Sequence, residues 1–452
     1  MAQNHRAKLT VGNIPTQLIK LTLPMIVGMI GMVVFNLTDT FFLGQLGTDQ
    51  LAALSFTFPV VLIVGSLVKG IGMGTSAILS KYIGAHDMDN VKHTATNSLL
   101  LGLIISSIAV IIGLSTIRPL FSLLGAEGVI LDYIEDYMSI WYYGTIMVVI
   151  PMIGNEIIRA MGDTKVPGLI MGVSAFVNII LDPILIFGYG PIPALGIQGA
   201  AIATVFARSI TAVTSVSILY FREKIITFSN NSFTALIAAW QKILYIGIPN
   251  SLIQMALPVG AGIITRMLSS YGPNVVAGYG VATKIEFFAI AFANALTSVM
   301  GPFIGQNLGS KLFDRVKTGL KVGELYAMGS GIMIAILLSI FAHPIASIFN
   351  KAPEVVETTV LYIRIVSFSF GFQGILKIST TVLNVLNKPF HASMIIFIQT
   401  FALYIPLAKF GSSFAGLTGI FGALFISYFA VGILAHFLVR RNLQQYIQTP
   451  SS

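Results

Sequence analysis

Residues 24–47 read PMIVGMIGMVVFNLTDTFFLGQLG, and Asp39 is the one charged side chain among them. A run of about 20 apolar residues is long enough to cross a lipid bilayer as a helix. The rest of the chain has the same character, because 55% of its 452 residues are hydrophobic and 10% are charged. Soluble domains carry about 25% charged residues. The sequence therefore predicts a polytopic membrane protein and excludes a soluble enzyme.

Twelve apolar runs of this kind follow one another along the chain. We place them near residues 18–44, 52–80, 94–117, 130–160, 166–189, 193–221, 240–270, 275–306, 318–346, 355–384, 389–411 and 416–439. If the runs alternate in direction, thirteen Lys and Arg residues of the polar breaks and termini fall on one side, against Arg118, Lys351 and Lys409 on the other. By the positive-inside rule, we expect both termini in the cytoplasm and the chain in the cell (inner) membrane.

The opening stretch recurs 225 residues later as PNSLIQMALPVGAGIITRMLSSYG, residues 249–272. At this offset ten of the 69 positions from Pro24 to Lys92 are identical, and a Gly-x-x-Gly-Ala pattern at 196–200 returns at 419–423. The repeat predicts two pseudo-symmetric six-helix lobes, residues 1–225 and 226–452, joined by a polar linker near 222–235. Six spans per repeat make the repeats parallel, an architecture that suits alternating access.

Several chemistries lack the residues that they would need. The chain has no cysteine, and its six histidines are scattered, so neither a disulfide framework nor a zinc-type metal site is predicted. The net charge of +9 is spread between apolar runs, so it indicates membrane topology and not a nucleic-acid partner. No Walker lysine motif is present, and we expect no cofactor other than a coupling ion.

Four motifs occur in order in the first half of the chain. They are DTFFLGQLG at 39–47, NEIIRAMGDTK at 155–165, NIILDP at 178–183 and GIQGAAIAT at 196–204. Together with twelve spans and a two-lobe repeat, they resemble the multidrug and toxic compound extrusion (MATE) family, in its DinF-like branch. The resemblance implies an all-α secondary transporter that exports organic cations and other amphipathic compounds in exchange for H⁺ or Na⁺.

The same resemblance implies a cation-coupling site in the N-terminal lobe. Matched by motif, its residues are Asp39, Asn178, Asp182 and Thr204. Tyr137 and Asn155 are expected in the substrate cavity or in the hydrogen-bond network around the site, and Pro24 matches a position that bends the first helix. The repeat partners of the two acids, Ile264 and Ile405, are apolar, which favours the DinF-like branch over the branch that uses acids of the C-terminal lobe.

The two acids have a physical reason to be functional. An ionised group within an apolar run is costly, so such residues usually face the protein interior and serve a function. Asn178 precedes Asp182 by four residues, so the two share a helix face. Two carboxylates held together away from water cannot both ionise cheaply, and such a pair takes up a proton as a unit. Their oxygens would also suit Na⁺ at Asp39, Asn178, Asp182 and Thr204, so residue types leave the ion open.

The alternative function is a flippase for a lipid or lipid-linked oligosaccharide, of the related superfamily. A flippase would need basic residues for a pyrophosphate, and the bases within apolar runs are few and scattered. The charged residues within runs include Lys69, Glu156, Arg266, Glu286 and Lys377. An enzyme fits less well, because the loops are short and the histidines do not cluster. A channel fits less well, because the repeat and the paired buried acids suit alternating access better. We therefore expect a monomeric antiporter, not an enzyme, whose partners are small cationic or amphipathic substrates and the lipid bilayer.

Overall fold

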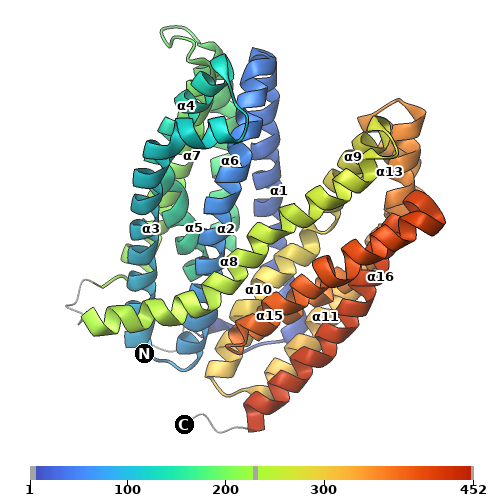
Figure 1. The fold of residues 1–452 in the computed structure, drawn as a ribbon. Coiled ribbons are helices and arrows are strands. Elements are labelled where there is room, and N and C mark those ends of the chain that lie inside the picture. Colours follow the sequence, from blue (N-terminus) through green and yellow to red (C-terminus); the bar gives the residue numbers. More distant parts are fainter. Residues whose placement is uncertain (1–6, 228–232, 449–452) are drawn as a thin grey trace. The chain divides into compact units, whose positions relative to one another are not determined.

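The computed structural model describes residues 7–227 and 233–448, and most of them are helical (Figure 1). Nine helices of these ranges are long and apolar enough to cross a membrane, and two bent helix pairs raise the number to eleven. One of the nine, Pro389–Gln448, contains two spans, because Ala415 and Gly416 depart from helical geometry inside it. The predicted all-α membrane fold of twelve spans is thus confirmed.

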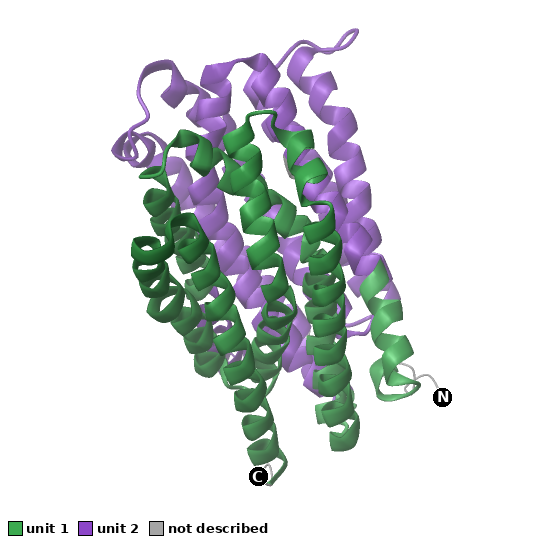
Figure 2. Cartoon of the chain, turned by 90° about the vertical axis from the view of Figure 1, so that its right-hand side faces the viewer, with its two compact units in different colours: residues 1–23, 84–86, 252–452 green, residues 24–83, 87–251 purple. Residues whose placement is uncertain are grey.

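The described chain divides into two compact units (Figure 2). Unit 2 holds residues 24–83 and 87–251, and unit 1 holds residues 7–23, 84–86 and 252–448. Helix α1 (Ile14–Leu46) contributes to both units and divides at Pro24, and helix α8 (Phe233–Ser269) divides after Ser251. The lobes 1–225 and 226–452 stay a prediction. Part of the linker predicted between them, residues 228–232, lies outside the described residues.

Unit 2 is built around α7. Besides its shares of α1 and α8, it contains α2 (Thr48–Gly84), α3 (Met88–Leu123), α4 (Gly128–Tyr143), α5 (Thr145–Ala160), α6 (Lys165–Phe187), α7 (Gly196–Ser217) and the π-helix η3 (Ile218–Arg222). Helix α7 packs against α4, α5 and α6. At Gly199 a β-carbon would collide with the backbone of Leu185, so a glycine is needed where α7 approaches α6. Helices α4 and α5 form one span, bent by 48° at Gly144.

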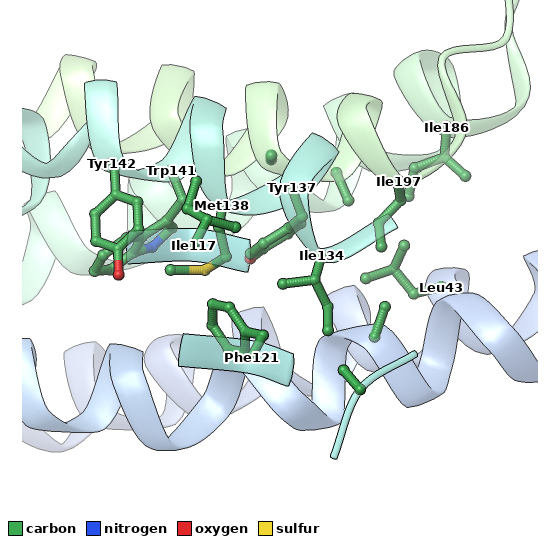
Figure 3. Close-up of a cluster of buried hydrophobic side chains, with 14 residues drawn as sticks. Leu43, Ile117, Phe121, Ile134, Tyr137, Met138, Trp141, Tyr142, Ile186 and Ile197 are labelled. Carbon is green, nitrogen blue, oxygen red and sulfur yellow. The ribbon is translucent and has the colours of Figure 1, made fainter. Parts of the chain in front are cut away.

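A buried hydrophobic cluster joins α1, α2, α3, α4, α6 and α7 within unit 2 (Figure 3). It includes Leu43, Ile117, Phe121, Ile134, Tyr137, Met138, Trp141, Tyr142, Ile186 and Ile197. Leu43 lies one helical turn after Asp39, and Ile186 lies one turn after Asp182. Because these two apolar side chains are fully buried, the cluster holds α1 and α6 in place beside the two acids.

Unit 1 packs most of its helices around α14. Its elements are η2 (Lys8–Thr10), α9 (Pro273–Ala289), α10 (Ala291–Gly309), α11 (Phe313–Ile340), α12 (Ala342–Phe349), α13 (Pro353–Val366), η4 (Ser367–Ser369), α14 (Phe370–Val385), α15 (Pro389–Phe397), the π-helix η5 (Ile398–Tyr404) and α16 (Ile405–Gln448). Helix α14 contacts α10, α11 and α16. Helices α9 and α10 form one span, bent by 44° at Ile290.

The segment before α1 is anchored on α10 and α11 within unit 1. The backbone N–H of Leu9 donates to Gln306 Oε1 at 3.0 Å, and Asn307 Nδ2 donates to the Leu9 carbonyl at 3.1 Å. Arg315 Nη1 donates to the Gly12 carbonyl at 2.9 Å. Leu9, Gln306 and Asn307 are all buried, so these bonds hold the start of α1 against unit 1.

Candidate functional site

Four predicted site residues come together within unit 2. Asp39 lies on α1, Asn178 and Asp182 lie on α6, and Thr204 lies on α7. The Asn178 amide nitrogen donates to Asp182 Oδ1 at 3.0 Å and to Asp39 Oδ1 at 3.4 Å. The Thr204 hydroxyl donates to Asp39 Oδ2 at 3.3 Å. These contacts join residues that are far apart in the sequence into one polar cluster, which we call the Asp39 cluster.

Close packing of α1 on α6 brings Asp39 within reach of Asn178. A β-carbon added at Gly28 would lie 2.8 Å from the Gly168 Cα atom, and one added at Gly31 would lie 3.3 Å from the Gly172 Cα atom. Glycine at these contacts lets the two backbones approach more closely than larger side chains would allow. Asp39 and Asn178, about two to three turns further along the two helices, can therefore meet.

Asp39 and Asp182 are within hydrogen-bond range of each other, so a proton bound to one acid would join the two. While both acids are ionised, two oxygen atoms of the Asp39 cluster accept no hydrogen bond from the described residues. They are Asn178 Oδ1 and Asp182 Oδ2. Asn178 and Asp182 are fully buried, whereas Asp39 is half-buried. A buried polar atom without a partner is costly, so these oxygens indicate that a further group belongs there. Carboxylate, amide and hydroxyl oxygens form a hard donor set, which fits a proton or Na⁺.

Arg208 is a neighbour of the cluster that the sequence interpretation missed. It lies on α7 one turn after Thr204, and it is within electrostatic range of Asp39. Its guanidinium carbon lies 4.8 Å from the centre of the Phe35 ring, a cation–π distance. The spacing of four residues from Thr204 was the available signal, because it places the two side chains on one face of α7.

The other predicted residues lie outside this set of hydrogen bonds. Tyr137 on α4 is buried in the hydrophobic cluster, within electrostatic range of Asp39 and Asp182 (Figure 3). Asn155 on α5 is buried, and its Oδ1 atom has no partner among the described residues. Pro24 lies inside α1, at the point where the helix passes from unit 1 to unit 2. The roles predicted for these three residues stay predictions.

A second charged group in unit 2 lies on α2 and α5. Glu156 and Arg159 form an ion pair one turn apart on α5, and Lys69 on α2 is within electrostatic range of both. Gly72 makes this arrangement possible, because a β-carbon there would lie 2.8 Å from Glu156 Cγ. Lys69 and Glu156 are visible in the sequence as charges within apolar runs. Lys69 and Glu156 lie near each other because α2 packs on α5, and the sequence alone does not show this contact.

The comparisons with known proteins identify the family of this chain. The sequence model of the MatE family matches residues 24–184 and 249–410, so its second match begins 225 residues after the first, at the offset of the internal repeat. The chain is 37% identical to an FAD transporter of Shewanella oneidensis, over 94% of each chain. It is 26% identical to the multidrug export protein MepA of Staphylococcus aureus, over 92% of each chain.

Solved structures give the same result for the fold. The crystal structure of an aspartate-to-asparagine mutant of the Vibrio cholerae MATE transporter VcmN superposes with a TM-score of 0.91 at 28% identity, covering 96% of this chain and 99% of that one. The bent form of VcmN superposes with a TM-score of 0.90 at the same identity, covering 96% of this chain and 98% of that one.

Proposed function

This chain belongs to the MATE family of membrane transporters, and from that premise we propose that it is an antiporter that expels organic cations and other amphipathic compounds in exchange for H⁺ or Na⁺. The observation that carries the proposal is the Asp39 cluster. It combines two carboxylates with buried oxygens that lack partners among the described residues. A site of this composition can take up and release a small cation, as a coupling ion must.

The ion acts by changing the charge of the site. When H⁺ or Na⁺ binds between Asp39 and Asp182, the pair becomes less negative, and its contacts with α1 change. The part of α1 that follows Pro24 then shifts, and the affinity for the outgoing substrate falls. Coupling requires that the ion and the substrate favour different conformations, because a ligand that binds both equally drives nothing.

The ion gradient sets the direction of transport, and the topology sets the side from which each ligand enters. With both termini in the cytoplasm, the chain lies in the cell (inner) membrane, and the substrate enters from the cytoplasm or from the inner leaflet. The imported ion then moves down its gradient while the substrate leaves. This orientation is supported by the distribution of Lys and Arg in the loops.

The test uses the full-length protein in proteoliposomes loaded with ethidium. A pH gradient and a Na⁺ gradient are imposed separately, and efflux is followed by fluorescence. We expect one gradient to drive efflux and the Asp39→Asn variant to lose it. Gradient-driven efflux that persists at full rate in Asp39→Asn would contradict the coupling role of the cluster. No efflux of any cation with either gradient would shift the proposal to the lipid flippase, for which fluorescent-lipid flipping is the assay.

FAD is a second candidate substrate, for a specific reason. The identity with the Shewanella oneidensis FAD transporter is 37%, whereas that with Staphylococcus aureus MepA is 26%. The Arg208 guanidinium supplies a positive charge within unit 2, which an anionic dinucleotide would need. The same proteoliposomes, loaded with FAD instead of ethidium, test this candidate, and Arg208→Gln should slow FAD efflux more than ethidium efflux.

A further inference from the structure

Arg208 is a cation in the membrane-spanning part of unit 2 that the proposed coupling mechanism does not use. It lies near the middle of α7 and is half-buried, so its guanidinium is far from both ends of the helix. Among the described residues, no carboxylate lies within ion-pair distance of Arg208. An arginine does not lose its charge in a protein. A permanent charge at this depth without an ion pair is costly, which indicates a function.

Two successive contacts join α7 to α1 within unit 2. The Thr204 hydroxyl donates to Asp39 Oδ2 at 3.3 Å. The Arg208 guanidinium carbon lies 4.8 Å from the centre of the Phe35 ring. Arg208 follows Thr204 by four residues and Phe35 precedes Asp39 by four, so the two contacts are one helical turn apart. Arg208 is therefore close enough to attract Asp39 but is held by a different partner.

The packing of α6 and α7 fixes the Phe35 ring. Phe35 is 4% exposed and packs with Ala175 of α6 and Ala207 of α7. The Ser174 hydroxyl donates to the Ala207 carbonyl at 3.3 Å, which ties α6 to α7 beside the ring. Because the face of an aromatic ring attracts a cation, the fixed ring keeps the Arg208 guanidinium one turn away from Asp39. The carboxylate oxygens of Asp39 are then left to other ligands.

The charges around the Asp39 cluster nearly balance. When ionised, Asp39 and Asp182 carry two negative charges, and Arg208 carries one positive charge. The amide and the threonine hydroxyl of the cluster are neutral, and Tyr137, within electrostatic range of both acids, has an uncharged hydroxyl. Among the described residues that act on the two acids, one negative charge is therefore left over. A single H⁺ or Na⁺ brings the site to neutrality.

We propose that Arg208 is the resident counter-charge of the coupling site, held off Asp39 by Phe35, and that it limits the site to one monovalent cation per transport cycle. This inference rests on the proposed antiport. With Arg208 present, a second cation would leave a net positive charge away from water, which is costly. Without Arg208, one cation would leave a net negative charge, so the site would hold that cation more tightly and attract a second one.

The test measures ethidium efflux by the full-length protein in proteoliposomes as a function of the concentration of the driving ion. Arg208→Gln should lower the half-maximal ion concentration about tenfold or more and make the dependence steeper, because nearby charges interact strongly away from water. For H⁺, the half-maximal point moves to higher pH. Arg208→Lys keeps the charge and should restore most of the wild-type dependence. Phe35→Leu should raise the half-maximal concentration, because the released guanidinium can pair with Asp39 and compete with the ion.

Two control variants change the same residue types elsewhere in unit 2. Arg118→Gln removes an exposed guanidinium of α3 that pairs with Asp132 and Glu135. Phe176→Leu changes an exposed ring of α6. Neither residue is among the groups that act on Asp39 or Asp182. Both variants should therefore keep the ion dependence of the wild type.

The outcomes separate this inference from the proposed function. Unchanged or weakened ion affinity in Arg208→Gln would overturn the inference, while ion-driven efflux by the wild type would still support the antiporter. If no ion gradient drives efflux by the wild type, the antiporter and this inference fail together. A melting curve shows whether Arg208→Gln is folded. If it is not folded, Phe35→Leu decides the question, and a wild-type ion dependence in that variant would overturn the inference.

Discussion

At the scale of single residues, Asp182 and Asp39 differ in burial and in the hydrogen bonds that their oxygens accept. Asp182 is fully buried, one of its oxygens accepts from Asn178, and the other accepts no hydrogen bond from the described residues while Asp39 is ionised. Asp39, half-buried on another helix, has donors for both of its oxygens. The two acids therefore differ in environment, and the unsatisfied oxygen of Asp182 is the natural point at which a coupling ion would bind.

Removing the Thr204 hydroxyl should distinguish H⁺ from Na⁺ as the coupling ion, because it should strengthen the binding of H⁺ and weaken the binding of Na⁺. Its donation to Asp39 Oδ2 favours the ionised carboxylate. Thr204→Val should therefore tighten proton binding and move half-maximal H⁺-driven efflux to higher pH. If Na⁺ is the ion, the same variant removes an oxygen ligand and should weaken Na⁺ dependence. A hydrogen bond to a charged group contributes about 1.5–3 kcal/mol, so we expect the affinity for the coupling ion to change on the order of tenfold.

Efflux rates measured as a function of pH and of Na⁺ concentration check this expectation. Thr204→Ser keeps the hydroxyl and should behave as the wild type. Thr211→Val is a matched control, because Thr211 is a buried threonine on the same helix whose hydroxyl bonds to the Arg208 carbonyl instead. Unaltered dependence on both ions in Thr204→Val would remove Thr204 from the coupling site.

At the scale of elements, the contact between α1 and α6 decides whether the residues of the proposed coupling site can meet. Gly168 is in the first turn of α6, and a β-carbon there would collide with the Pro24 carbonyl of α1. Pro24 itself has no N–H for the helix bond to the preceding turn, so α1 is easier to bend at this position. The close contact and the weak point of the helix therefore coincide.

Gly168→Ala should separate α1 from α6 and weaken transport. The new methyl group must displace backbone atoms, a change that typically costs about 1–3 kcal/mol. We expect a lower melting temperature and efflux reduced severalfold. Gly172→Ala, one turn further along α6, is the control. A β-carbon at Gly172 has open space, and replacing a helical glycine by alanine stabilises by about 0.5–1 kcal/mol. Equal melting temperatures for the two variants would show that the contact is not tight.

At the scale of the whole molecule, α1 is shared between the two units. Residues 14–23 of the helix belong to unit 1, and residues 24–46, which include Asp39, belong to unit 2. The anchor formed by Gln306, Asn307 and Arg315 holds the segment before α1 on unit 1. A change at Asp39 can therefore reach unit 1 through a continuous helix.

Arg315→Gln should loosen this anchor. The guanidinium bonds to the Gly12 carbonyl and to Asn307 Oδ1, at 2.9 and 3.1 Å. Losing charged donors of this kind costs about 1.5–3 kcal/mol, so hydrogen exchange at the Leu9 amide should accelerate at least about tenfold. Exchange followed by mass spectrometry on the N-terminal peptide measures it. Lys317→Gln, which changes an exposed base on the same helix, should leave the exchange rate as it is.

Local patterns in the sequence were sufficient for the class of protein and the number of spans. Hydrophobicity and charge distribution depend on residues that are near one another in the sequence, and the repeat is found by comparing positions 225 residues apart. The twelve-span fold and the family that these patterns predicted are confirmed. Asp39 and Asp182 stood out because a carboxylate in an apolar run is conspicuous. The grouping with Asn178 and Thr204 was implied by the family resemblance, and its role in ion coupling stays a prediction.

Contacts between distant residues were decided by tertiary structure alone. The bond from Asn178 to Asp39 spans 139 positions. Whether two such side chains meet depends on how each helix is rotated and how closely its backbone approaches, which no local pattern encodes. For the same reason Arg208 escaped the sequence interpretation. Apolar character marked out this chain as a membrane protein, and glycine-lined helix packing determined which of its few polar groups lie together.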